Sequence, residues 1–271
     1  NIILIFSFKN LKNYKKSPIC VDISSNNYLY LKDIINFKIK INKIVKNKCL
    51  VFLIYSNNID FVAIYLSILS LKIVPLILNE RIHKTFLNKL KRAYKPRLIF
   101  FPNSINIKKK IRKFSNYYSY ETFNKNSFKI DKNIALLAST SGTTGSSKNV
   151  VCSYKNLNFS AYTISKYLKI SKNDRPLMTL PLSYVYGLSV LNSHIIKRAT
   201  IYLASENFLN RKFWEIIVEN KITTFPLVPY QVEILHKINF GKFDLNYIKY
   251  LTIAGGKTTF QLLKNIYKIF K

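Results

Sequence analysis

At the middle of the chain stands Ile134-Ala135-Leu136-Leu137-Ala138-Ser139-Thr140-Ser141-Gly142-Thr143-Thr144-Gly145-Ser146-Ser147-Lys148, an apolar run that leads directly into a loop of hydroxyls, two glycines and a lysine. The apolar run predicts a buried strand. The glycines let backbone N–H groups turn toward an anion without a Cβ in the way, and the hydroxyls and the lysine ammonium add further donors. The stretch therefore predicts a strand followed by a phosphate-binding loop.

Two other interpretations of this loop compete with that one. The P-loop of nucleoside triphosphatases requires a glycine before its lysine and Ser or Thr after it, whereas this chain has Ser147 and Asn149 at those positions. A Ser/Thr-rich surface turn is the plainer alternative, because clusters of Gly, Ser and Thr usually form turns. Turn chemistry seldom gathers so many donors together with a lysine, so we favour the phosphate loop.

Strand-like and helix-like segments alternate along the chain, which predicts the fold class α/β, with layered parallel sheets and flanking helices. Strands are expected at Cys49–Ser56, Val74–Leu78, Leu98–Phe101, Val150–Cys152, Leu177–Leu180, Thr200–Leu203, Thr223–Phe225 and Tyr250–Ala254. Helices are expected at Ile59–Leu71, Lys84–Ala93, Asn156–Leu168, Leu188–Ile196, Lys212–Glu219, Tyr230–Ile238 and Thr259–Phe270. Residues Ser104–Asn133 break the alternation and predict an irregular connection with room for one short helix.

The composition limits the classes of function that are possible but does not identify one. The chain has 271 residues, of which 48% are hydrophobic, so it can bury a large core in one or two domains. Its formal net charge of +32 comes mostly from lysines spread over the whole length, beside abundant Ile, Asn, Tyr and Phe. This mixture is what codons rich in A and T encode, and arginine, the preferred contact for phosphate and guanine, is scarce. We therefore expect no specific nucleic-acid partner, although the charge could help to recruit anionic substrates such as ATP.

A basic nucleic-acid or anionic-membrane binder remains the alternative, and it would need lysines gathered on one face and binding that weakens steeply with salt. The apolar segment Phe61–Leu78 does not predict a membrane span, because Lys72 and Pro75 interrupt it well short of the roughly 20 residues required.

Cysteine and histidine usage points to a reducing compartment, and we expect a cytoplasmic protein. Cys20, Cys49 and Cys152 show no metal-ligand spacing and do not form a disulfide framework. The three histidines, His83, His194 and His236, stand alone and are interpreted as surface or packing residues. No metal site is predicted from these residues.

Four segments, taken in order, resemble signatures of the adenylate-forming superfamily, which includes acyl-CoA synthetases, luciferases and the adenylation domains of peptide synthetases. Ser139–Lys148, with Val150 after it, resembles the phosphate-binding signature. Leu180–Leu188 resembles the aromatic-rich second signature, with Tyr184 in the usual His position. Val228–Tyr230 resembles a proline element before an acyl-pocket helix, and Ile253–Lys257 resembles the Gly-Gly turn that lies along adenine. Upstream, Val51 to Asn79 looks like the family's early strand–helix–strand, with Ile73 where a glycine is common.

The resemblance, which covers roughly Tyr28 to Lys271, implies a reaction and a set of site residues. A carboxylate attacks the α-phosphate of ATP, giving an acyl-adenylate and pyrophosphate, and the adenylate is then captured by the thiol of coenzyme A or of a carrier protein. Mg²⁺ is implied as well. The implied ATP phosphate-binding residues are Thr140, Ser141, Gly142, Thr143, Thr144, Gly145 and Lys148, the glycines permitting close backbone approach. Gly255 and Gly256 would lie against adenine, and Tyr184, Tyr186, Gly187 and Val228 would form the acyl pocket.

Plainer interpretations exist for the last two groups of residues. A Gly-Gly pair after a strand can be an ordinary tight turn, and aromatic residues before a glycine can simply fill the core. The segment Ser183–Ser189 contains no carboxylate that could pair with the ammonium of an amino acid. A site without that partner rejects such a substrate, so we expect an acyl or aryl acid.

The resemblance also implies that residues 1–271 are an incomplete N-terminal AMP-binding domain. The family's magnesium-binding Glu, its ribose-binding Asp and the small C-terminal domain with the adenylation lysine would lie beyond Lys271, so no catalytic residue is assigned in this chain. We expect weak nucleotide binding and no turnover from this chain alone. The alternative is a noncatalytic or degraded relative that binds only nucleotide or an acyl ligand, and Ile73 and Asn149, where glycine is frequent, favour it.

Overall fold

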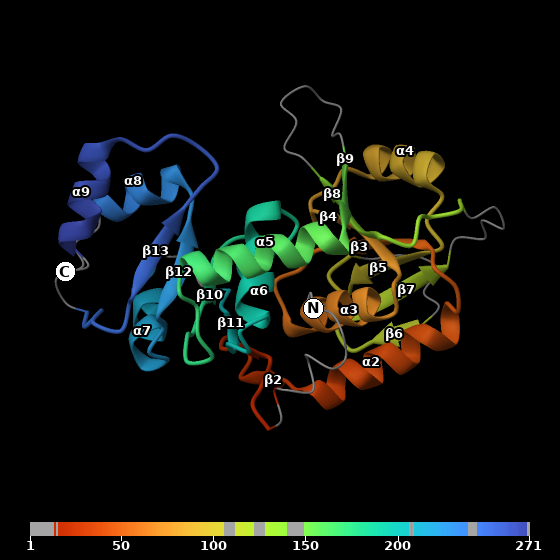
Figure 1. Ribbon diagram of the computed structural model, residues 1–271, viewed down its shortest axis with the longest axis horizontal. Helices are drawn as coiled ribbons and strands as arrows, with labels where there is room; N and C mark the ends of the chain where they lie inside the picture. Colours follow the sequence, from red (N-terminus) through yellow and green to blue (C-terminus); the bar gives the residue numbers. More distant parts are fainter. Residues whose placement is uncertain are drawn as a thin grey trace.

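Three sheets lie side by side along the long axis of the molecule, with helices around and between them (Figure 1). The computed structural model describes residues 14, 16–105, 112–121, 128–139, 149–205, 207, 209–237 and 243–269. Among these residues the sheets have seven strands in the order β6-β7-β5-β3-β4-β8-β9, four strands in the order β10-β11-β1-β2, and two strands, β12 and β13.

The seven-stranded sheet is parallel at its centre and antiparallel at both margins. Its strands are β3 (Leu50–Ile54), β4 (Val74–Leu78), β5 (Leu98–Pro102), β6 (Arg112–Phe114), β7 (Tyr117–Glu121), β8 (Ile134–Ser139) and β9 (Asn149–Ser153). Strand β3 pairs in parallel with β4 and β5, and β4 pairs in parallel with β8. At the margins, β7 runs antiparallel to β5 and to β6, and β9 runs antiparallel to β8.

Both faces of this sheet are covered by helices, which explains why its central strands are continuously apolar. Helices α2 (Leu31–Ile44) and α3 (Ile59–Ser70) lie on one side, and α4 (Lys84–Tyr94) lies on the other (Figure 1). Side chains alternate along β3, so that Val51 and Leu53 join the cluster that contains α3, whereas Phe52 and Ile54 pack with Leu90 of α4. Each strand residue therefore has a buried partner on one face or the other.

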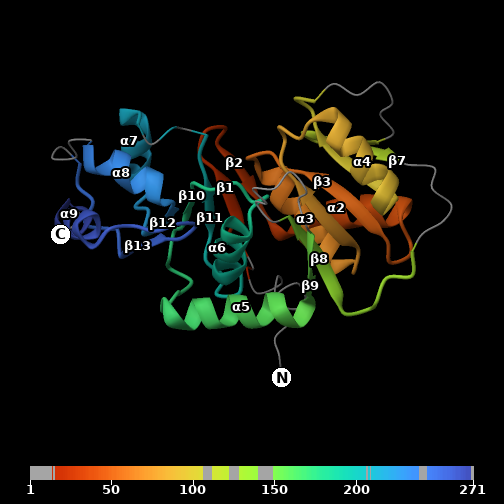
Figure 2. The ribbon, with the colours of Figure 1, turned by 90° about the horizontal axis from the view of Figure 1, so that it is seen from above.

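The four-stranded sheet forms the middle of the molecule. It contains β1 (Cys20–Asp22), β2 (Asn27–Leu29), β10 (Leu177–Met178) and β11 (Ile201–Leu203), and β11 runs parallel to both β1 and β10. Helix α6 (Val185–Ile195) packs on β10 and β11, and α5 (Tyr154–Tyr167) packs on α6. Figure 2 shows α5 on the outside, with α6 between it and the strands.

The third sheet pairs β12 (Thr224–Leu227) with β13 (Tyr250–Ile253) in parallel. Around it lie α7 (Arg211–Glu219), α8 (Pro229–Lys237) and α9 (Phe260–Ile269). Its core is built on Phe213, Trp214 and Phe225, whose rings meet edge to face with centroids 5.1 to 6.1 Å apart. Aromatic pairs favour this arrangement because the positive ring edge meets the negative ring face.

The predicted α/β class is confirmed, and the predicted strands and helices match observed elements to within a few residues at each end. The prediction of an irregular connection over Ser104–Asn133 is wrong within its described part, where β6 and β7 form a hairpin on the sheet margin. Phe114 and Tyr117 anchor this hairpin: both are fully buried, and the Tyr117 hydroxyl donates to the Ile54 carbonyl at 2.9 Å. Arg112 and Lys113, before the first anchor, are exposed, and the polar residues Ser115 and Asn116 separate the two anchors, so the two-residue period that a strand normally shows is hidden.

His194 is a buried packing residue of α6, as one of the two sequence interpretations expects. Its Nδ1 donates to the Val190 carbonyl at 2.8 Å, and its Nε2 has no partner among the described residues. Burial lowers the pKa of His194 from its ordinary value to about 4, because a charged imidazole would lose its hydration there. The ring is therefore neutral in the folded protein.

This burial predicts a specific loss of stability in acid. Between its folded and unfolded pKa values, His194 takes up a proton only in the unfolded chain, so the free energy of unfolding falls as pH drops below its ordinary pKa. We expect His194 to account for a loss of about 2 kcal/mol between about pH 7 and about pH 5. Urea unfolding of His194→Asn, which keeps a donor near the Nδ1 position, should show that much less loss than the wild type. His83→Asn, at an exposed position, is the matched control, and an equal loss in wild type and His194→Asn would contradict the assignment.

Candidate functional site

The predicted phosphate-binding loop follows directly after a strand in the sequence, as predicted. Strand β8 ends at Ser139 and β9 begins at Asn149, so the two strands form the stem from which the loop extends. Residues Ala135, Leu136, Leu137 and Ala138 of β8 are buried. The predicted phosphate-binding residues Thr140, Ser141, Gly142, Thr143, Thr144, Gly145 and Lys148 lie outside the described residues.

The predicted adenine-binding turn follows β13 and lies against the end of β12. Gly255 has a φ of +92°, which only glycine adopts without strain, and a Cβ there would stand 3.7 Å from Cγ1 of Val228. A Cβ on Gly256 would come within 3.1 Å of the Pro229 ring. Both glycines are exposed, so the turn presents bare backbone to solvent beside Val228 and Pro229. The exposure of this turn is compatible with the predicted contact with adenine, which stays a prediction.

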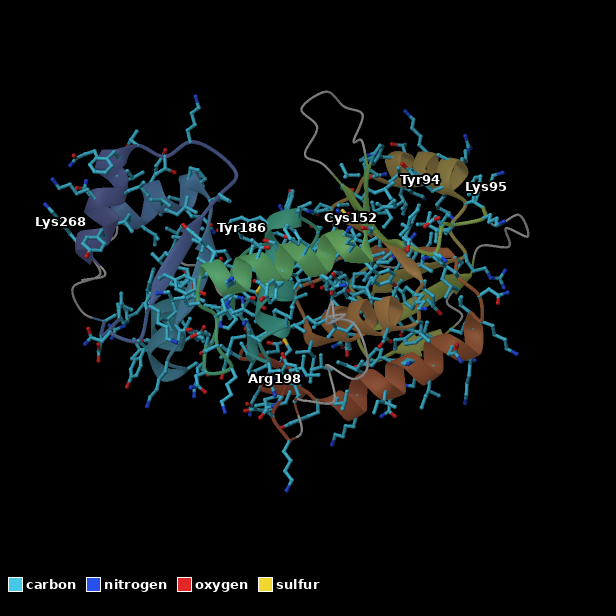
Figure 3. The ribbon with its side chains drawn as sticks, in the orientation of Figure 1. Tyr94, Lys95, Cys152, Tyr186, Arg198 and Lys268 are labelled. Atoms are coloured by element: carbon cyan, nitrogen blue, oxygen red, sulfur yellow. The ribbon has the colours of Figure 1, made fainter. Side chains whose placement is uncertain are left out.

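Tyr186 connects the second signature to the strand that leads into this turn. Tyr186 lies in the first turn of α6, near the β12–β13 pair (Figure 3), and its hydroxyl donates to Oγ1 of Thr252 on β13 at 2.9 Å. Burial raises the pKa of Tyr186, while hydrogen bonds with Thr252 and the Leu227 backbone partly oppose the rise. The hydroxyl therefore stays protonated near neutral pH and acts as a structural donor. The second signature is in this way bonded to the strand that precedes the Gly-Gly turn, and that turn lies beside Val228 and Pro229.

Tyr184 and Gly187 occupy different settings within the same segment. Tyr184 is the N-cap residue of α6 and is 47% exposed, so its ring does not fill the core. Gly187 lies inside α6, where a Cβ would approach the Pro181 carbonyl oxygen to 2.6 Å. Glycine is required there because the backbone of Leu180 and Pro181 passes directly against the helix. Whether Tyr184, Tyr186, Gly187 and Val228 contact an acyl group stays a prediction.

A cavity of about 340 Å³ opens beside this segment, at the carboxyl ends of β3, β10 and β11. Parallel α/β folds bind ligands in this position, beyond the carboxyl ends of their strands. Six polar residues line the cavity: Tyr55, Asn57, Thr179, Ser205, Asn207 and Gln231. Six apolar residues complete the lining: Leu177, Met178, Leu180, Pro181, Ala204 and Phe213. No charged side chain is present among these lining residues, and the predicted acyl-pocket residues are not among them.

The polar groups around the cavity also hold the three sheets together. Asn57, which follows β3, donates through Nδ2 to the Ala204 carbonyl after β11 at 2.9 Å. Thr179, which follows β10, donates to the Pro226 carbonyl of β12. The Gln231 side chain accepts from the Val228 amide at 2.9 Å. Sequence reasoning missed these three residues. Asn57 follows directly after a predicted strand, whereas Thr179 lies inside one and Gln231 lies inside a predicted helix, so their positions gave only a partial signal.

The described residues do not provide a metal centre. No group of three or more His, Cys, Asp or Glu side chains comes together in the part of the chain that the structure describes. No Mg²⁺ ligand is therefore assigned among the described residues, and no step is assigned to that ion. None of the described helices combines the length and the apolar character needed to cross a bilayer.

Comparison with known proteins agrees with the motif order. The model of the AMP-binding enzyme family matches residues 41–271. A 2-succinylbenzoate–CoA ligase of Listeria monocytogenes is 30% identical over 128 residues, which is 46% of this chain and 27% of that enzyme. The long-chain-fatty-acid–CoA ligase FadD13 of Mycobacterium tuberculosis is 27% identical over 129 residues, which is 47% of this chain and 25% of that enzyme. These matches span about a quarter of the length of the curated relatives.

The fold is also shared with solved structures. The inhibitor-bound N-terminal domain of FACL13 from Mycobacterium tuberculosis superposes with a TM-score of 0.74 at 14% identity, covering 96% of this chain and 72% of that one. At this level of identity the likeness concerns the fold alone.

The close approach at Gly187 predicts a measurable cost for one added methyl group. In Gly187→Ala the new Cβ would meet the Pro181 backbone, which cannot rotate away. Overpacking of this kind costs about 1–3 kcal/mol, and the better helix propensity of Ala offsets only about 1 kcal/mol. We therefore expect a net loss in the free energy of unfolding, measured in urea. Gly256→Ala is the control, because its neighbour is a proline ring atom that can shift by a few tenths of an ångström. Equal losses in the two variants would contradict the steric account.

Proposed function

This chain belongs to the AMP-binding enzyme family, and from that premise we propose that it is the nucleotide- and acid-binding portion of an AMP-forming acid–thiol ligase. In the proposed reaction, a carboxylate attacks the α-phosphate of ATP, and pyrophosphate leaves as the acyl-adenylate forms. A thiol such as that of coenzyme A then displaces AMP and becomes the thioester. The names of the relatives, which are CoA ligases for aromatic and fatty acids, support this class of reaction.

The observation that carries the proposal is the convergence of three separate signatures. Tyr186 of the second signature is bonded to Thr252 on β13, and Gly255 and Gly256, three and four residues further along, lie beside Val228 and Pro229. Tyr186 and Thr252 are 66 positions apart in the sequence and Val228 and Gly255 are 27 apart, so these approaches depend on the fold. A base laid on the Gly255–Gly256 turn would thus stand beside the segment proposed to hold the acid. Proximity of this kind supplies much of the catalysis in a displacement that needs little covalent help.

We further propose that the cavity receives an uncharged part of an organic substrate. Its volume of about 340 Å³ lies at the small end of the range for ligand sites, and its described lining carries no charge. A carboxylate or a polyphosphate would be left without a charged partner there, whereas a hydrocarbon, aryl or amide segment would not. The acid's tail and the thiol's arm both have this chemistry. The absence of a carboxylate in Ser183–Ser189 agrees with an acyl or aryl acid.

The phosphate loop gives the first test of the proposal. Lys148 is expected to donate a charge-assisted hydrogen bond to ATP, and such bonds contribute about 1.5–3 kcal/mol. Lys148→Ala should therefore weaken ATP binding by about 10- to 100-fold, measured by titration calorimetry on the 271-residue chain. Lys155→Ala removes an equal charge from an exposed position at the start of α5 and should leave the affinity unchanged. If the two variants bind ATP alike, the loop is not a phosphate site.

The cavity gives the second test. Ser205 is exposed at the rim of the cavity and uses only its backbone amide, which donates to Ser24, in the described contacts. Ser205→Phe should fill part of the space and weaken binding of the occupying ligand by about tenfold or more, while ATP affinity is kept. Titrations with an acid panel and with coenzyme A separate the two candidate occupants, and Ser205→Ala controls for the lost hydroxyl. Unchanged affinity for every ligand would exclude the cavity as a substrate site.

A further inference from the structure

The two strands that flank the glycine-rich loop, β8 and β9, are joined by a side-chain contact that the sequence signature does not predict. Ser139, the last residue of β8, stands directly across the ladder from Asn149, the first residue of β9. Members of the family resembled by this signature frequently have glycine at the position of Asn149. The side chain of Asn149 is therefore additional to what the phosphate-binding signature requires.

The Asn149 amide bridges three elements of the fold. Its Oδ1 accepts a hydrogen bond from Oγ of Ser139 at 3.2 Å, and its Nδ2 donates to the hydroxyl of Tyr94 at 2.9 Å. Tyr94 is the last residue of α4, which covers one face of the seven-stranded sheet (Figure 3). One planar side chain thus connects β8, β9 and α4. All three residues are half-buried, so the bonds are partly shielded from water.

This bridge compensates for the weak attachment of β9. The strand lies at the edge of the sheet and pairs with β8 on one side only. Val150 and Val151 are 49% and 56% exposed, so side-chain packing does little to hold the beginning of the strand. An edge strand with little packing can shift or fray more easily than a central one. The Asn149 amide supplies the attachment that packing does not.

We propose that Asn149 is a positioning residue for nucleotide binding, through its bridge to Ser139 and Tyr94. The bridge fixes the spacing of the two stem residues and their direction relative to α4. Ser139 and Asn149 flank the predicted phosphate-binding residues in the sequence, so fixing these two positions lowers the ordering entropy that binding a phosphate would cost. This inference rests on the proposed function, because it assumes that the loop binds ATP.

Three variants test the bridge. Asn149→Gly restores the residue common in the family and removes both hydrogen bonds, whereas Tyr94→Phe removes one of them. We expect ATP affinity to fall about tenfold in the first and about threefold in the second, since each bond contributes modestly and the glycine adds flexibility. The double variant should bind ATP no more weakly than Asn149→Gly alone, because Tyr94 acts only through Asn149. Tyr154→Phe is the matched control: it removes a hydroxyl bonded at 2.9 Å to Leu69, at the opposite end of β9 from Asn149, and should keep wild-type affinity.

Amide hydrogen exchange gives a readout that does not depend on nucleotide. Exchange in β8 and β9 next to Ser139 and Asn149 should be faster in Asn149→Gly and in Tyr94→Phe than in the wild type, and unchanged in Tyr154→Phe. If the wild type binds ATP and the stem variants bind it equally well, the inference is overturned and the proposed function stands. If the wild type binds no ATP, both are overturned. Additive losses in the double variant would contradict the bridge even where each single variant weakens binding.

Discussion

The arrangement of the site depends on one constraint, the burial of both faces of the parallel strands β3, β4 and β5. With α2 and α3 on one face and α4 on the other, no side chain of β3 is left for solvent, so only the strand ends remain for chemistry. Parallel pairing turns those ends toward the same edge. Tyr55 and Asn57, which follow β3, line the cavity together with residues that follow β10 and β11 of the four-stranded sheet.

The same constraint explains which parts of the fold could be predicted from sequence. Strands buried on both faces appear as continuous apolar runs, so Leu50–Ile54 and Val74–Leu78 stand out. The hairpin strands β6 and β7 lie at a margin, where Arg112 and Lys113 are exposed, and their pattern does not separate them from a loop. The glycine signatures were visible because backbone geometry limits the residue type. The cavity was not, because Tyr55 and Phe213 become neighbours only in three dimensions.

Hydrophobic packing and hydrogen bonds between elements together locate the site residues. One hydrophobic cluster joins the seven-stranded and four-stranded sheets, since it contains Val51 and Leu53 of β3 together with Ile201 and Leu203 of β11. Hydrogen bonds from Asn57 to Ala204, Thr179 to Pro226 and Tyr186 to Thr252 add links between segments that are far apart in the sequence. A bond of this kind contributes little to overall stability, about 1 kcal/mol, but it fixes direction in a way that apolar packing does not. Substitutions near these bonds should therefore lower the free energy of unfolding only slightly, while their effect on function should be larger.

The net charge of the chain and the shape of the cavity contribute differently to recognition. A formal charge of +32 creates a field that attracts any polyanion, so it can speed the arrival of ATP without selecting it from other anions. Salt screens that field within about 10 Å, and the described lining of the cavity contains none of the charges that produce it. Under the proposed function, the cavity would then recognise its occupant through neutral walls, with Phe213 and Met178 on the apolar side and Asn57 and Gln231 on the polar side. A change of ionic strength would accordingly alter how fast the nucleotide is captured, whereas the dimensions of the cavity would decide which uncharged group it accepts.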